Sequence, residues 1–174
     1  FARKPAPVSL NWLDHALTTG LTTIDYILGD PLYTPPGSEA CFSEKPWALP
    51  RTVFPFRPHR PDEPVGPSPA LANGYVTFGT LSRSIRVNDR VVETWARVLE
   101  RAPKSKLLVF SKNYQDEGVK NELLGRFDAH GVERERIELG FNPEPGDIFR
   151  QIDIALDCFP HNSGVTLYEH AYMG

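Results

Sequence analysis

The chain has 174 residues, of which 40% are hydrophobic and 24% are charged, and its formal net charge at pH 7 is -3. This composition is typical of a globular protein, and the negative net charge argues against a general nucleic-acid binder. No apolar run is long enough to span a bilayer, so we expect no membrane partner. Two cysteines, Cys41 and Cys158, provide neither a disulfide framework nor a metal-ligand spacing, which favours reduced thiols and a cytoplasmic location.

The first 30 residues contain two short stretches that are typical of strands, Ala6–Trp12 and Ile24–Leu28. Eleven of the 17 prolines follow between Pro31 and Pro69. Because proline lacks a backbone donor and fixes φ, this stretch cannot form the interior of a sheet. We expect residues 31–72 to be an extended connector between two lobes.

From residue 73 onward, strand-like and helix-like segments alternate, which predicts an α/β lobe with a parallel sheet. Ligands bind such sheets at the carboxyl ends of the strands. The chain stops at Gly174, within a predicted helix that could not bury its apolar face alone, so we expect a piece of a longer protein. The expected strands are Tyr75–Phe78, Lys106–Phe110, Arg136–Leu139 and Asp153–Leu156, and the expected helices are Asn88–Arg101, Gln115–His130 and Gly146–Gln151.

The stretch from Asp157 to Met173 has the order strand end, small-residue turn and helix start. Free N–H groups in the first turn of a helix, together with its dipole, favour an anionic group. Glu169, further along the helix, could accept hydrogen bonds from a ribose. These residues predict a nucleotide-diphosphate site, with an ordinary strand–helix connection as the alternative. A G-x-G-x-x-G fingerprint and a P-loop are both absent from the sequence.

Three segments together resemble one known family, the O-linked N-acetylglucosaminyltransferases, including the SPINDLY-like proteins. The first segment is FARKPAPV with Trp12, Leu13 and the triplet Thr18-Thr19-Gly20, the second is NGYVTFG at residues 73–79, and the third runs from Asp153 to Gly174. The resemblance implies a GT-B glycosyltransferase, in which two Rossmann-like lobes face each other. Residues 1–30 would then end the first lobe, residues 31–72 would connect the lobes, and residues 73–174 would form most of the nucleotide-sugar-binding lobe.

The resemblance also implies the activity, which is transfer of N-acetylglucosamine from UDP-GlcNAc to Ser/Thr hydroxyls of an acceptor protein or peptide. It implies no cofactor and no metal, and it implies upstream tetratricopeptide repeats that recruit partners. Two alternatives remain open. One is a GT-B transferase with a different donor, such as GDP-fucose, and the other is a non-catalytic binding module derived from the same fold.

The site residues implied by the resemblance lie in three loops. Arg86 matches the family lysine that neutralises the departing phosphate and is the expected catalytic residue, with Arg83 as a second cation. Glu169 matches the acidic residue assigned to the ribose. The turn expected to hold the pyrophosphate comprises Asn162, Ser163, Gly164, Val165 and Thr166, and Thr18, Thr19 and Gly20 are candidates for lining the sugar pocket.

Several positions depart from the family pattern. Val165 and Leu167 replace threonines of the pyrophosphate turn, and Pro145 stands near the place of a family histidine. His161 matches a tyrosine, so no catalytic role is implied for it. His15 is expected to be a spectator or a residue that positions the substrate. These departures put N-acetylglucosamine as the donor sugar in question.

Overall fold

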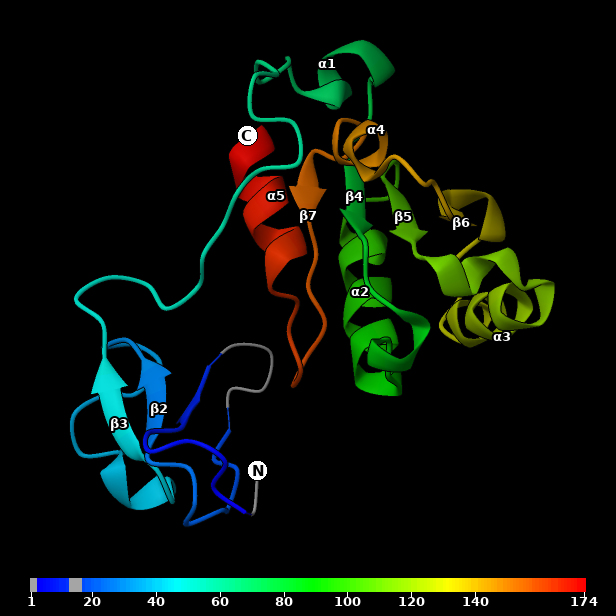
Figure 1. Ribbon diagram of the computed structural model, residues 1–174. Helices are drawn as coiled ribbons and strands as arrows, with labels where there is room; N and C mark the ends of the chain where they lie inside the picture. The colour runs from blue at the N-terminus through cyan, green and yellow to red at the C-terminus, as the bar shows by residue number, and fades with distance from the viewer. Residues whose placement is uncertain (1–2, 13–16) are drawn as a thin grey trace. The chain divides into compact units, whose positions relative to one another are not determined.

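The computed structural model describes residues 3–12 and 17–174, and the chain divides into two compact units, one ending at Phe56 and the other beginning at Arg57 (Figure 1). The boundary expected after residue 30 therefore lies inside the first unit. The boundary expected after residue 72 lies inside the short helix α1 (Pro69–Asn73). Within the described ranges, no helix combines the length and the apolar character needed to cross a bilayer.

The first unit contains a parallel sheet in the order β1 (Leu10–Asn11), β2 (Tyr26–Gly29) and β3 (Lys45–Ala48). The connector prediction for residues 31–72 missed β3 and the short 3-10 helix η1 (Glu39–Cys41) before it. Proline is tolerated in β3 because this strand lies at the edge of the sheet, where one side of the backbone needs no ladder hydrogen bond. Abundant prolines thus excluded a central strand here, but not an edge strand.

Asp30 ties the segment after β2 to the end of that strand. Its carboxylate accepts hydrogen bonds from the backbone N–H groups of Tyr33, at 2.8 Å, and Val53, at 2.9 Å. The bond from Val53, opposed by burial, is the main reason why the pKa of Asp30 lies below its usual value. Much of the predicted connector is therefore fastened to the first sheet.

The second unit contains a four-stranded sheet in the order β6-β5-β4-β7, and every pair in it is parallel, which confirms the predicted α/β class (Figure 1). The strands are β4 (Thr77–Thr80), β5 (Lys106–Phe110), β6 (Ile137–Gly140) and β7 (Ile154–Ala155). The helices are α2 (Asp89–Arg101), α3 (Glu117–Asp128), α4 (Pro145–Phe149) and α5 (Val165–Met173), with 3-10 turns η2 (Ser84–Arg86), η3 (Lys112–Gln115) and η4 (Arg134–Arg136).

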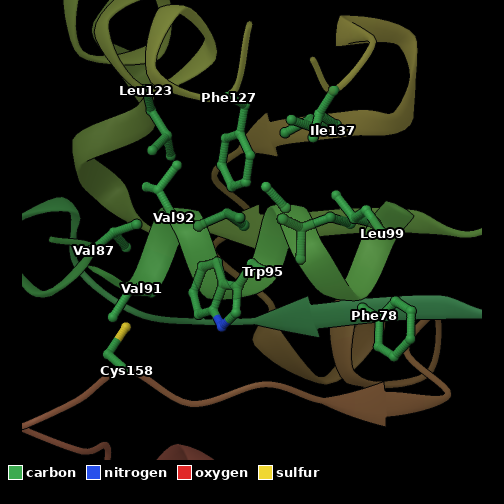
Figure 2. Close-up of a cluster of buried hydrophobic side chains, with 14 of the residues drawn as sticks. Phe78, Val87, Val91, Val92, Trp95, Leu99, Leu123, Phe127, Ile137 and Cys158 are labelled. Carbon is green, nitrogen blue, oxygen red and sulfur yellow. The ribbon is translucent and has the colours of Figure 1, made fainter. Parts of the chain in front are cut away.

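Helix α2 provides the centre of the main core. As predicted, Asn88 caps its N-terminus, since the side chain accepts a hydrogen bond from the N–H of Val91 at 3.1 Å. Figure 2 shows Trp95 and Leu99 of this helix among the buried side chains of the neighbouring elements. Strand β5 alternates, so that Leu107 and Val109 enter this core while Leu108 and Phe110 pack with Ile148 of α4 in a second cluster. Both faces of the sheet are thus covered, as in a Rossmann-like lobe.

Asp153 fastens the start of β7 to its surroundings. Its carboxylate accepts hydrogen bonds from the hydroxyl of Ser68 and from the N–H groups of Ala70 and Thr77, both at 2.9 Å. Burial raises the pKa of this group, but the bonds from Ser68, Thr77 and Ala70 outweigh burial and hold the pKa below its usual value. Asp153 therefore aligns β7 with β4, which places the loop that follows β7.

Candidate functional site

The sheet reverses its strand order at β4. From β4 the chain adds β5 and β6 on one side, and it then crosses to add β7 on the other side of β4. In open parallel sheets, ligands bind at such a reversal, outside the carboxyl ends of the two strands concerned. The candidate site is therefore the pair of loops that follow Thr80 in β4 and Ala155 in β7.

These two loops are joined by buried hydrogen bonds. The hydroxyl oxygens of Ser82 and Ser163 lie 3.0 Å apart, and the hydroxyl of Thr80 donates to Ser82 at 3.0 Å. The side-chain amide of Asn88 donates to the carbonyl oxygen of Phe159 at 2.6 Å. The loop after β4 and the loop after β7 are therefore fastened to each other.

Asp157 shapes the loop after β7. One carboxylate oxygen accepts hydrogen bonds from the backbone N–H groups of Cys158, at 2.8 Å, and Ser163, at 2.9 Å. The loop is thereby drawn together just before the first residue of α5. Neither Asp157 nor Ser82 was among the expected site residues. Asp157 directly follows a predicted strand and Ser82 comes four residues after one, and this closeness to strand ends was the signal that could have identified both.

A surface cavity of about 330 Å³ lies between the two loops. Both expected cations, Arg83 and Arg86, line it, and His161 of the opposite loop lines it as well. The remaining lining residues are Ile85, Asn88, Phe159 and Pro160. Two guanidinium groups and an imidazole in one open cavity form a surface suited to an anionic ligand.

The charge of Arg86 also reaches the buried thiol beneath this cavity. Burial and, to a smaller extent, the charge of Asp157 raise the pKa of Cys158, and the hydrogen bond to Ser82 and the charge of Arg86 offset only part of that rise. Figure 2 shows Cys158 facing Val91 of α2, at the edge of the main core. Arg86 therefore lies close enough to the loop after β7 for its charge to act on a residue of that loop, and its contact with a phosphate stays a prediction.

Helix α5 begins at Val165, after Gly164, and no side chain caps its first turn. The leading N–H groups of a helix have no intrahelical acceptor, so an uncapped and exposed start can receive an anion. Asn162, Gly164 and Val165 are exposed, and Thr166 is half-buried. Ser163 differs from its neighbours in the turn, because it is buried and bonded to Ser82 and Asp157.

Glu169 is buried in α5 rather than solvated. One of its carboxylate oxygens accepts a hydrogen bond at 2.9 Å from the backbone N–H of His59. Nearby, the hydroxyl of Tyr172 donates to the carbonyl of Pro61 at 2.7 Å. Helix α5 therefore holds the segment around residue 60, and the ribose contact assigned to Glu169 stays a prediction.

The third group of expected residues belongs to the first unit. Thr18, Thr19 and Gly20 are exposed, and both threonine hydroxyls donate to Glu44. The sequence did not single out Glu44, which lies 25 residues or more from the loop that it binds. His15 lies outside the described residues.

The parallel sheets and the loops at the switch point agree with the GT-B architecture that the sequence predicted. Over 98% of its length the chain superposes on a Thermobaculum terrenum O-GlcNAc transferase mutant, with a TM-score of 0.87 and 31% identity, and it covers 33% of that structure. A pneumococcal O-GlcNAc transferase solved with UDP and GlcNAc shares the fold, with a TM-score of 0.51 and 14% identity over 87% of this chain and 29% of that one. No family model matches the sequence.

Among curated proteins, the chain is 34% identical over 99% of its length to the probable UDP-N-acetylglucosamine–peptide N-acetylglucosaminyltransferase SPINDLY of Solanum lycopersicum. The match spans 19% of that relative. Over nearly its whole length the chain therefore matches members of the O-linked N-acetylglucosaminyltransferase family, which includes the SPINDLY proteins, and the resemblance noted in the sequence is confirmed.

Proposed function

We propose that the protein containing this chain transfers a sugar from a nucleotide donor, UDP-GlcNAc first among the candidates, to Ser/Thr hydroxyls of an acceptor protein. The names of its relatives support this activity, although the chain spans 19% of the SPINDLY protein quoted above. The main structural support is the cavity that collects Arg83, Arg86 and His161 at the switch point of the sheet. Recruitment through upstream helical repeats and a cytoplasmic location belong to the same proposal.

The chemistry requires a cation where the leaving group departs. In the transfer, the anomeric C–O bond breaks, the β-phosphate takes the electron pair, and the acceptor hydroxyl bonds to the anomeric carbon and gives up its proton. Negative charge therefore grows on the phosphate while the sugar becomes oxocarbenium-like. We assign the neutralisation of that charge to Arg86, with Arg83 in the same cavity and with the uncapped start of α5, which follows the loop that lines the other side of the cavity.

Arginine in this role differs from the family lysine. A guanidinium is planar and can bind two phosphate oxygens at once, whereas an ammonium acts as a point charge. Arg86 therefore suits a bidentate contact with the diphosphate, and a lysine substitution would keep the charge but lose that geometry.

A different donor, such as a GDP-sugar, is the second candidate. At the first position of α5 the family threonine is replaced by Val165, which is 61% exposed and offers no hydroxyl to a phosphate or a sugar. Loss of this hydroxyl changes which sugar nucleotide the site prefers, while the two arginines of the cavity remain. A non-catalytic module would retain the cavity and bind a nucleotide without turnover.

The test uses the full-length protein and a panel of UDP- and GDP-sugars, with thermal shift and donor hydrolysis as the readouts. We expect one nucleotide to stabilise the wild type, Arg86→Ala to abolish that stabilisation, and Arg86→Lys to keep part of it. Arg97→Ala is the matched control, because Arg97 is an exposed arginine of α2 outside the cavity. Absence of a response to every nucleotide would overturn the proposal, and binding without hydrolysis or transfer would identify the non-catalytic module.

A further inference from the structure

The second unit contains another surface cavity, of about 200 Å³, which is lined by residues of η2, η3 and α3. Three apolar side chains contribute to its wall, and these are Ile85, Val119 and Leu123. Sites for drug-sized ligands have volumes of roughly 300–1,000 Å³, so this cavity admits only a smaller molecule. Its apolar wall suits a compact hydrocarbon group, because contact with the wall removes that group from water.

Two residues that line the same cavity carry buried donors without an acceptor. Neither the hydroxyl of Tyr114 nor the Nε of Arg126 has a hydrogen-bond partner among the residues that the structure describes. Arg126 forms an ion pair with Asp89 through Nη2, at 2.9 Å, so its Nε–H is left unpaired. A buried donor without an acceptor is destabilising, and native structures usually satisfy such groups with protein, water or an ion. Both groups are therefore free to bond an acceptor atom of a ligand.

Charges of both signs act on the Tyr114 hydroxyl. Burial, and next the Cys158 thiol, raise the pKa of Tyr114 above its usual value, so the phenol is protonated and can donate. The charge of Arg126 opposes this rise and that of Glu122 adds to it, which places both groups near the hydroxyl. Glu122 is exposed and also lines the cavity. Because an anion would meet the Glu122 carboxylate, a neutral ligand fits this cavity better than a charged one.

We propose that this cavity binds a small neutral carboxamide that carries a compact apolar group. The amide carbonyl oxygen accepts hydrogen bonds from the Tyr114 hydroxyl and the Arg126 Nε–H, and the amide NH₂ donates to the Glu122 carboxylate. The apolar group lies against the three apolar side chains of the wall. All the lining residues belong to the second unit, and the inference goes beyond the proposed function without depending on it.

The first experiment titrates the full-length protein with benzamide and follows binding by saturation-transfer NMR of the ligand. Benzamide should bind saturably. Benzoate should bind about tenfold more weakly, because it brings a negative charge to Glu122 and has no amide hydrogens to donate. Acetamide should also bind at least about tenfold more weakly, because it lacks the apolar ring. Failure of benzamide to bind, or equal binding of either comparison compound, would overturn the inference.

The second experiment tests the polar contacts. Tyr114→Phe should weaken benzamide binding by about fivefold, the size expected for one hydrogen bond between neutral groups, while thermal unfolding shows that the variant stays folded. Tyr75→Phe is the matched control, because it removes a hydroxyl outside the cavity and should leave binding unchanged. Glu122→Gln should reduce the preference for benzamide over benzoate, since it removes the negative charge. Equal affinity of wild type and Tyr114→Phe, or an unchanged preference in Glu122→Gln, would refute the assigned contacts.

A third variant distinguishes this cavity from the one that contains the two arginines. Arg86 does not line the smaller cavity, so Arg86→Ala should leave benzamide binding unchanged. Loss of benzamide binding in this variant would place the compound in the arginine cavity and overturn the inference. Loss of nucleotide binding alone in Arg86→Ala would agree with both proposals, whereas a wild type that binds benzamide but no nucleotide would refute only the proposed function.

Discussion

The hydroxyl oxygens of Ser82 and Ser163 lie 3.0 Å apart in the interior, although 81 residues separate them in the chain. This contact joins the loop that carries Arg86 to the turn that opens α5. Because Ser82 also accepts a bond from Thr80, it is the central member of a buried chain of three hydroxyls. The geometry of the candidate anion site therefore depends on a pair of small polar residues beneath it.

Ser82→Ala should lower the free energy of unfolding by about 1–3 kcal/mol, because Thr80 and Ser163 would each lose a buried partner. Urea unfolding would measure this loss. Thr94→Ala, in an exposed part of α2, is the control and should change stability by less than about 0.5 kcal/mol. An unchanged midpoint in Ser82→Ala would show that a water molecule replaces the hydroxyl.

The contribution of Glu44 to stability should disappear in acid. Its pKa falls from 4.5 to about 2 on folding, so the carboxylate stabilises the native state fully above pH 4.5 and loses this effect progressively as the pH approaches 2. Urea unfolding of the wild type and of Glu44→Gln at a series of pH values would test this. The difference between the two proteins should shrink as the pH falls through that window, and a constant difference would contradict the assignment.

Arg136 should act as the C-terminal cap of α2. Its guanidinium donates to the carbonyl oxygens of Leu99, Ala102 and Ser105 at 2.8–3.0 Å. Arg136→Ala should cost about 2–3 kcal/mol, because these acceptors lose a charged donor, and Arg136→Lys should recover part of the loss. Arg134→Ala is the comparison, since the pair of Arg134 with Asp128 is exposed to solvent and should contribute much less. Chemical denaturation would rank the three variants, and equal costs for the two alanine variants would rule out the cap.

Tyr114→Phe should leave the protein as stable as the wild type or more stable, by up to about 1 kcal/mol. The ring of Tyr114 is 1% exposed, and its hydroxyl has no hydrogen-bond partner among the described residues. Removing an unpaired buried hydroxyl removes a desolvation cost while the ring keeps its packing. Thermal unfolding would measure the change, with Tyr114→Leu as the variant that should destabilise through altered packing. A loss of more than about 1 kcal/mol in the phenylalanine variant would mean that the hydroxyl has a partner in solution.

The helices and central strands of the second unit could be predicted because their signals are local. Asn88 caps α2 and Gly131, at a φ of +75°, follows α3, as the sequence indicated, and β5 has the predicted bounds. Strand β4 was placed two residues early, since Tyr75 and Val76 continue the same apolar pattern. Strand β3 was missed, because its propensity is weak and pairing with β2 supplies its stability.

The candidate site, too, could be predicted from the sequence only in part. Residue types and order in the sequence were enough to indicate the cations Arg83 and Arg86, the turn before α5 and the family. The sequence could not indicate that Ser163 faces Ser82, that Glu169 accepts a hydrogen bond from the backbone of His59, 110 residues away, or that Glu44 accepts hydrogen bonds from Thr18 and Thr19. Capping, periodicity and turn chemistry act over a few residues, so the chain itself determined its elements and its chemical groups. Only the tertiary structure decided which of those groups meet. Pairing of the strands, with β7 placed beside β4, brought distant loops together, because such contacts depend on the path of the chain through the sheet.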